Sequence, residues 1–260
     1  MDLHLQQKVF IVTGGAKGIG AAISKTLAEE GASVVIAGRD KNDNQKMVDE
    51  IVLAKGKATS HTIELADPEA CKELIQFTVD KFGRLDGLIN NAGVNDGVSI
   101  EEGSPEAFMQ SIVKNLSHIY NLTHYALPHL KTSKGVVINI GSKVAETGQG
   151  RTSGYAASKG GMNALTREWA AAFLPYGIRV NTVIPAEVWT PLYATWIKTF
   201  ENPDAKLKEI TSKIPFEQRF TTSEEIANMV VFLASDRSSH TTGQIIYVDG
   251  GYTHLDRSLT

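Results

Sequence analysis

The 260-residue sequence contains a single cysteine, Cys71. One cysteine cannot form an internal disulfide, which agrees with a reducing compartment. Cys71 is spaced with Leu74, Ile75, Val79 and Phe82 along an apolar helical stripe. We therefore expect Cys71 to pack in the core rather than act as a nucleophile.

The sequence also lacks a long apolar run and a block of basic residues. No apolar run is long enough to span a bilayer, and the first eight residues, MDLHLQQK, lack the charged-then-apolar layout of a secretion signal. The formal net charge of -3 argues against binding to nucleic acid. We expect a cytoplasmic protein with neither a membrane nor a nucleic acid as partner.

Short apolar strands alternate with helical patterns along the whole chain, and no linker, repeat or low-complexity segment divides it. Repeated strand–helix units imply a parallel sheet with helices on both faces. This pattern predicts an α/β, doubly wound fold with a seven-stranded parallel sheet in one domain, residues 1–260. The expected strands are 8–12, 33–37, 57–63, 86–90, 135–140, 178–184 and 244–248.

A glycine-rich loop with Gly14, Gly18 and Gly20 follows the first expected strand and opens a helix. Glycines let the backbone turn tightly and let a pyrophosphate approach, while a helix N-terminus presents unpaired N–H groups. Three residues separate the first two glycines, where the common dinucleotide fingerprint has one. The loop predicts a phosphate site, and a simple turn is the alternative.

The second expected strand ends in Gly38-Arg39-Asp40, where a nucleotide-binding unit meets the adenosine ribose. The guanidinium of Arg39 suits a 2′-phosphate, and Lys17 in the glycine loop can approach the same group. Asp40 can instead accept hydrogen bonds from a 2′-hydroxyl. We favour NADP as the cofactor, with NAD as the alternative.

Polar motifs follow three further strands, at 90–93, at Ser142 and at 185–190. Because ligands in open parallel sheets bind at the carboxyl ends of strands, these residues are expected to meet in one site.

Tyr155 and Lys159 are four residues apart in a helical segment, which places their side chains on one face. An ammonium beside a phenol favours the phenolate, so the pKa of Tyr155 is expected to fall from its usual value of about 10. Such a tyrosine can act as a general base or acid. A structural helical pair is the alternative.

These motifs, in this order and spacing, closely resemble the short-chain dehydrogenase/reductase family over nearly the whole chain. The resemblance rests on Thr13-Gly-x-x-x-Gly-x-Gly20, 90–93, Asn115, Ser142, Tyr155-x-x-x-Lys159 and 248–251. It implies a Rossmann-type fold and a nicotinamide cofactor. It also implies that Tyr155 is the acid/base, that Lys159 lowers its pKa and holds the ribose, that Ser142 bonds the reacting oxygen, and that Asn115 holds a relay water.

The cofactor residues implied by this reading come from the glycine loop, the second strand and the loops after later strands. They are Gly14, Lys17, Gly18, Ile19, Gly20, Arg39, Glu64, Leu65, Asn91, Ala92, Gly93, Tyr155, Lys159, Pro185, Val188 and Thr190. Two positions depart from the family pattern. Glu64 stands where an aspartate is usual, and Ala186 stands where a glycine is usual, so the 185–190 loop is expected to take a different path.

Within the family the resemblance is closest to bacterial L-fucose dehydrogenases, on residues 91–97, 147–150, 184–193 and 248–257. Those enzymes oxidise the anomeric carbon of an aldose to the lactone. The expected substrates are L-fucose, L-galactose and D-arabinose.

The segments expected around the reacting carbon combine polar groups with aromatic rings, which suits a polyol better than a steroid or acyl chain. The predicted substrate contacts are Asn95, Ser142, Gln149, Tyr155, Glu187, Tyr193 and Trp196, with a lid at about 186–214. Trp196 can instead be core in a lid helix, 192–200. Lys143, Glu146 and Asp96 can be substrate contacts or solvated loop residues.

Two rival functions stay open from the sequence: a carbonyl reductase of the 3-oxoacyl or small-ketone type, and a non-catalytic NADP-binding regulator. We expect His118, His124 and His129 to lie at the surface or a subunit interface, and we expect no metal site. The resemblance implies a homotetramer packed through the helices of Asn115 and Tyr155 and through the last strand together with the helix that begins at Ser223. The tail 252–260 is a candidate for reaching a neighbouring pocket.

Overall fold

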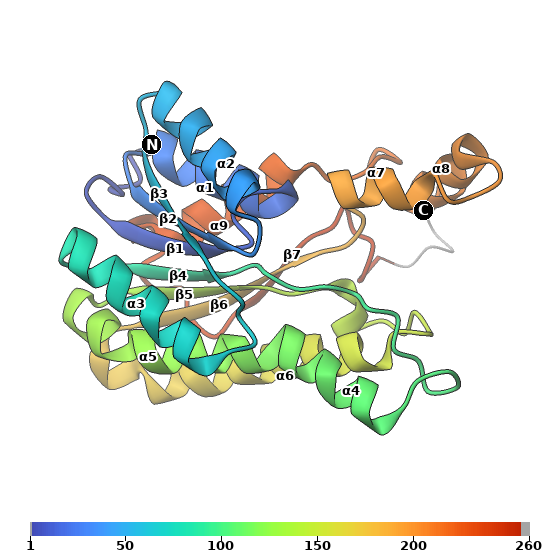
Figure 1. The fold of residues 1–260 in the computed structure, drawn as a ribbon. Helices are drawn as coiled ribbons and strands as arrows, with labels where there is room; N and C mark the ends of the chain where they lie inside the picture. The colour runs from blue at the N-terminus through green and yellow to red at the C-terminus, as the bar shows by residue number, and fades with distance from the viewer. Residues whose placement is uncertain (1, 256–260) are drawn as a thin grey trace.

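A seven-stranded parallel sheet forms the centre of the computed structural model, which describes residues 2–255 (Figure 1). In space the strands run β3-β2-β1-β4-β5-β6-β7, and every neighbouring pair is parallel. The strands are β1 (Val9–Thr13), β2 (Ser33–Gly38), β3 (Lys57–Thr62), β4 (Gly87–Asn90), β5 (Val136–Ile140), β6 (Arg179–Pro185) and β7 (Ile245–Val248). The predicted doubly wound fold and all seven expected strands are confirmed, with ends that differ by one or two residues.

Helices cover both faces of the sheet. The main helices are α1 (Gly18–Glu29), α2 (Lys41–Leu53), α3 (Pro68–Phe82), α4 (Pro105–Ile112), α5 (His118–Ser133), α6 (Ser153–Ala172), α7 (Pro191–Ile197), α8 (Pro203–Thr211) and α9 (Ser223–Ala234). Short helical turns are η1 (Val113–Ser117), η2 (Lys143–Ala145), η3 (Leu174–Tyr176) and η4 (Asp236–Ser238). No helix within residues 2–255 is both long and apolar enough to cross a membrane.

The sheet separates two apolar cores. One joins the sheet to α1, α2 and α9, and the other joins it to α3, α5 and α6 (Figure 1). Strands β1, β2, β4 and β5 are buried almost throughout, which explains their continuous apolar sequences. Cys71 lies fully buried in the second core, as its spacing indicates.

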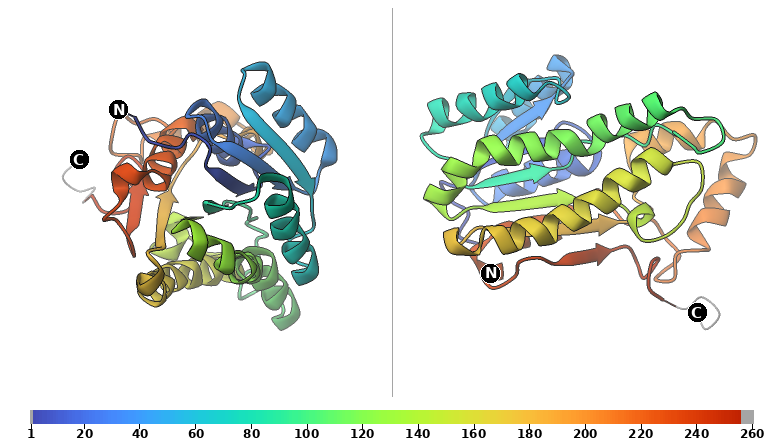
Figure 2. Two further views of the ribbon diagram at one scale, coloured as in Figure 1. Left: turned by 90° about the vertical axis from the view of Figure 1, so that its left-hand side faces the viewer. Right: turned by 90° about the horizontal axis from the view of Figure 1, so that it is seen from below.

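Two features differ from the sequence expectation. The single long helix expected over 105–130 is interrupted by a π-helical turn, η1, which contains Asn115. The lid helix expected over 192–200 is observed as α7, which ends at Ile197, and Asn202 and Pro203 begin a second short helix, α8, that was not expected. Helices α7 and α8 both lie beyond the carboxyl ends of the strands (Figure 2, right).

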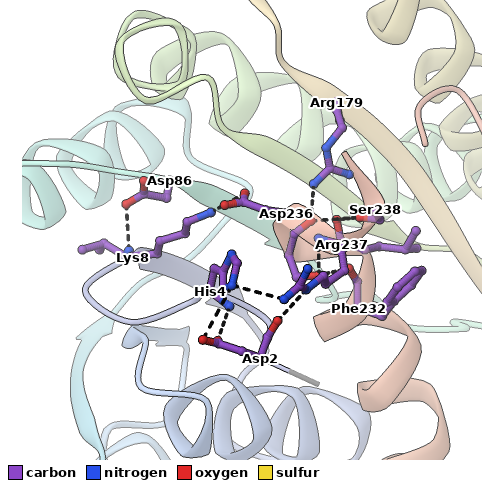
Figure 3. A network of polar contacts seen from close by, with 12 residues as sticks. Asp2, His4, Lys8, Asp86, Arg179, Phe232, Asp236, Arg237 and Ser238 are labelled. Carbon is purple, nitrogen blue, oxygen red and sulfur yellow. Dashed lines mark hydrogen bonds and ion pairs between the residues drawn. The ribbon is translucent and has the colours of Figure 1, made fainter. Parts of the chain in front are cut away.

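At the opposite, amino-terminal edge of the sheet, polar contacts join the first residues of the chain to η4 (Figure 3). Lys8 Nζ lies 2.7 Å from Asp236 Oδ1, and Arg237 Nε donates to the Asp2 carbonyl at 2.7 Å. Asp86, only 5% exposed, accepts from the Val9 backbone N–H at 2.9 Å. This edge is therefore closed by structural contacts and leaves the carboxyl edge for ligands.

We expect Asp86→Ala to lower the free energy of unfolding by about 1–3 kcal/mol, because the Val9 N–H would lose its acceptor in a buried place. Asp86→Asn is the control, since it keeps an acceptor oxygen while weakening the contact with Arg84. Urea unfolding measures both. Equal stability of wild type and the alanine variant would contradict this role.

Candidate functional site

The glycine-rich loop is held against the loop that follows β4. Thr13 Oγ1 accepts from the backbone N–H groups of Asn91 and Ala92, both at 3.0 Å, and Asn91 Nδ2 donates to the Thr13 carbonyl at 2.9 Å. Gly14 has a φ of +62°, which disfavours other residues. A Cβ at Gly20 would lie 2.1 Å from the Gly14 carbonyl oxygen. Gly20 therefore allows close packing of helix and loop.

The N-terminus of α1 opens directly from this loop. Its first residue is Gly18, its cap residue Lys17 makes no side-chain capping bond, and its first turn contains no acidic residue. The backbone N–H groups and the positive end of the helix dipole are thus available to an anion. This arrangement fits the pyrophosphate of a dinucleotide.

Arg39 and Lys17 both line the cavity at the end of β2. Asp40 is engaged there, because its Oδ1 accepts from the backbone N–H groups of Asn42 and Asp43 at 2.9 Å and so caps α2. These backbone bonds hold the pKa of Asp40 below its ordinary value. Lys17 forms an ion pair with Asp43.

Ser142, Tyr155 and Lys159 meet at the end of β5. Ser142 follows this strand, and α6 carries Tyr155 and Lys159 one turn apart, with Lys159 Nζ 5.6 Å from the centre of the Tyr155 ring. Lys159 Nζ donates to the Ile140 carbonyl at 2.7 Å. An ammonium group has three donors, so two remain for other partners.

The pKa of Tyr155 is raised in this structure, contrary to the expectation that Lys159 lowers it. Burial is the main cause, and hydrogen bonding with Ser142 offsets part of the rise. Burial also lowers the pKa of Lys159 to about 7. The sequence showed that the two side chains share a helix face but not that both lie in a low-dielectric interior, where the uncharged forms are favoured.

Asn115 occupies the π-helical turn η1 and is fully buried. Its Oδ1 accepts from the Val94 N–H at 2.7 Å, and its Nδ2 donates to the Ser111 carbonyl at 3.0 Å. A Cβ at Gly93 would lie 3.1 Å from Asn115 Oδ1 and 3.5 Å from Lys159 Nζ. Asn115 therefore fixes the loop after β4 close to Lys159.

One cleft of about 530 Å³ connects the glycine loop to Ser142, Tyr155 and Lys159. Every predicted cofactor residue except Gly20 lines it, although lining alone does not assign a role. The cleft is also lined by residues that were not predicted as cofactor or substrate contacts: Gly38, Ile63, Ala66, Val94, Lys114, Ile140, Gly141, Ala186, Pro191 and Leu192. Most are neighbours of motif residues, and that adjacency is the signal that could have found them.

The predicted substrate contacts divide into two groups. Ser142, Tyr155 and Tyr193 line the cleft, whereas Asn95, Gln149, Glu187 and Trp196 do not. Asn95 and Gln149 are exposed, and Trp196 is 44% exposed rather than buried in a lid core. Contact of these four with substrate stays a prediction.

Glu187 nevertheless bonds to a residue that lines the cleft. Its carboxylate accepts from Tyr193 OH at 3.1 Å and forms an ion pair with Lys143. Burial and this carboxylate both raise the pKa of Tyr193, which keeps it a phenol. The Tyr193 ring contacts three other aromatic rings, those of Trp189, Trp196 and Phe220.

His118 is buried, with 1% exposure, so its expected surface position is wrong. His118 is the first residue of α5, directly after the turn η1, and its burial is not visible in the sequence spacing. Neither ring nitrogen has a hydrogen-bond partner of normal geometry among the described residues. Burial, followed by the charge of Lys159, lowers the pKa of His118 to about 4.

Comparisons with known proteins agree with this geometry. A family model described as enoyl-(acyl carrier protein) reductase matches residues 14–253. The chain is 35% identical to 3-oxoacyl-[acyl-carrier-protein] reductase FabG of Thermotoga maritima, covering 96% of this chain and 99% of that protein. It is 37% identical to L-fucose dehydrogenase of Bos taurus, with 96% and 91% covered. The crystal structure of Cj0485 dehydrogenase superposes with a TM-score of 0.94 at 45% identity, over 100% of this chain and 99% of that one.

We expect His118 to make the free energy of unfolding fall as the pH is lowered. Its folded pKa of about 4 lies below the unfolded value of about 6.5, so its contribution is complete above pH ~6.5 and is lost as pH falls through ~4. The full loss is about 3 kcal/mol. We expect His118→Leu to remove most of this pH dependence in urea unfolding between pH 7 and pH 4. The exposed His124→Leu is the control and should keep it.

Proposed function

Because this chain belongs to the short-chain dehydrogenase/reductase family of oxidoreductases, we propose that it oxidises the anomeric carbon of an L-fucose-type aldose to the lactone. L-Fucose, L-galactose and D-arabinose are the proposed substrates. The observation that carries the proposal is a cluster of three polar side chains beside the reacting end of the cleft. In this cluster the Glu187 carboxylate accepts from Tyr193 and pairs with Lys143.

Carboxylate, phenol and ammonium groups next to aromatic rings suit a sugar. The hydroxyls of a polyol need hydrogen-bond partners, and its C–H face packs on aromatic rings. An acyl chain would cover the same polar groups without satisfying them, which is unfavourable. The similarity to a mammalian L-fucose dehydrogenase supports this choice.

The chemistry requires removal of a proton from the C1 hydroxyl while hydride leaves C1. In the proposed mechanism Ser142 bonds the reacting oxygen and the Tyr155 phenolate takes its proton. A bound nicotinamide cofactor supplies the hydride acceptor and, in its oxidised form, a positive charge. Because burial favours the neutral phenol, Tyr155 is ready as a base only when positive charge lies beside it.

Lys159 and Asn115 support the proton transfer. Lys159 keeps two donors free of the Ile140 carbonyl, which suits a ribose hydroxyl, and its pKa of about 7 allows it to gain and lose a proton near neutrality. Asn115 holds the loop after β4 against this amine through Val94. We propose that Lys159 passes the proton onward from Tyr155 and that Asn115 holds a relay water that receives it.

The cofactor proposed is NADP in preference to NAD. Arg39 and Lys17 line the cleft beside the place of the adenosine ribose, while the Asp40 carboxylate is occupied as the cap of α2. A 2′-phosphate gains charge-assisted bonds from a guanidinium there. The bonds that cap α2 take Oδ1 of Asp40 and leave only its second oxygen for a 2′-hydroxyl.

The lid and the assembly are further parts of the proposal. Helices α7 and α8 lie beyond the carboxyl ends of the strands, where residues 186–214 would close over substrate (Figure 2). Tyr120 on α5 is 55% exposed and lies near the Trp169 ring of α6, which suits burial between subunits of a tetramer. The proposed tail contact, 252–260, lies partly outside the described residues.

A carbonyl reductase of the 3-oxoacyl type is the second candidate. The 35% identity to FabG of Thermotoga maritima favours it. The Lys143–Glu187 pair beside Ser142 argues against it, because a hydrophobic tail would exclude water from the two charges without adding a hydrogen-bond partner to either.

We expect Tyr155→Phe to lower turnover of L-fucose by about 10²–10⁴-fold, because the base is removed while the ring remains. The measurement is NADPH absorbance with a panel of aldoses, ketones and acyl thioesters, and cofactor binding to the variant is the control for folding. Wild-type turnover of ketones or thioesters without turnover of any aldose would contradict the sugar proposal.

We expect Arg39→Ala to raise the KM for NADP by about 10–100-fold with little change for NAD, because only NADP has the 2′-phosphate. Lys41→Ala is the matched control, because Lys41 is a neighbouring exposed cation that does not line the cleft. It should leave the KM for both cofactors unchanged. An equal change for both cofactors would refute the preference.

A further inference from the structure

Lys143 and Glu187 form a charged pair in a sheltered place. Their side chains are 12% and 15% exposed, although they come from different segments, η2 and the loop between β6 and α7. Lys143 Nζ also lies 4.1 Å from the centre of the Tyr252 ring. Glu187 accepts from Tyr193 OH at 3.1 Å. Four segments are thus joined through one ion pair.

This pair stands at the reacting end of the cleft. Lys143 follows Ser142, Glu187 lies between Ala186 and Val188, and all three of these neighbours line the cleft. Tyr193 lines the cleft and contacts the carboxylate directly. A ligand that reaches Ser142 and Tyr193 is therefore close to both charges.

The two charges cancel when both are present. Tyr193 adds no charge, since its raised pKa keeps it protonated. Removing one partner of a sheltered pair leaves the other charge uncompensated in a region where water screens it poorly. The sign of the local field would then depend on which partner remains.

We propose that Lys143 and Glu187 cancel each other's charge beside the sugar site, and that this balance selects uncharged aldoses over sugar acids and amino sugars. This inference rests on the proposed function of the same cleft. Its consequence is reciprocal: without Glu187 the site prefers an anionic sugar, and without Lys143 it prefers a cationic sugar.

The test compares three sugars that differ only at C6: L-galactose, L-galacturonate and 6-amino-6-deoxy-L-galactose. For Glu187→Gln, the ratio of kcat/KM for the uronate to kcat/KM for L-galactose should rise about tenfold or more over wild type. For Lys143→Gln, the corresponding ratio for the amino sugar should rise by a similar factor. A double variant should return both ratios toward wild type.

Two further variants separate charge from structure. Tyr193→Phe removes a contact of Glu187 without changing charge, so activity should fall while the ratios stay at wild-type values. Lys143→Arg keeps the charge and should also keep the ratios. Because each ratio is measured within one variant, a general loss of folded enzyme does not change it.

The inference would be overturned if neither single variant changed its ratios, or if Glu187→Gln and Lys143→Gln favoured a sugar of the same charge. In either case, oxidation of L-galactose by wild type would leave the proposed function intact. Failure of wild type to oxidise L-galactose and the other neutral aldoses would overturn both.

Discussion

The hydrogen bond from the buried ammonium of Lys159 to the Ile140 carbonyl ties α6 to the end of β5. It fixes the helix in rotation, so that Tyr155, one turn earlier, lies beside Ser142 at the end of the same strand. Burial of this amine opposes its charge and brings its pKa to about 7. The site therefore contains a group that is unfavourable for stability and useful for proton transfer, as is common where function and stability compete.

The same amine connects the remaining parts of the cleft. Gly93 approaches it closely, and Asn115 holds that loop from the π-helical turn. Interruptions of this kind in helices often occur at functional sites, because they turn one side chain out of the regular register. The charge of Lys159 also acts on His118, which is buried directly after this turn.

The opposite wall of the cleft belongs to segments that come later in the chain. The loop after β6 and helix α7 bring Glu187 and Tyr193 to Lys143, and an aromatic group around Tyr193 supports them. In the proposed function, catalytic groups thus come from the sheet edge, and recognition groups come from the loops above it. This division lets related proteins keep one chemistry and differ in substrate.

Much of this architecture was predictable from sequence. Strand β5 and helix α3 follow from apolar runs and from cap signals such as Asp67-Pro68, which act locally. The glycine loop and the Tyr155–Lys159 spacing were also readable, because a short segment fixes its own backbone geometry. Helix α8 was missed, although the Asn202 cap and Pro203 at its first position were local signals for it.

The sequence by itself determined the order of strands and helices, the glycine-rich loop between β1 and α1, and the placing of Tyr155 and Lys159 on one helix face, since each depends on neighbours within a few residues. Only the tertiary structure decided the direction of the Tyr155 pKa shift, the burial of His118 and the meeting of Lys143 with Glu187. These depend on desolvation and on contacts between distant segments. Such quantities are set by how the elements pack, which spacing along the chain does not encode.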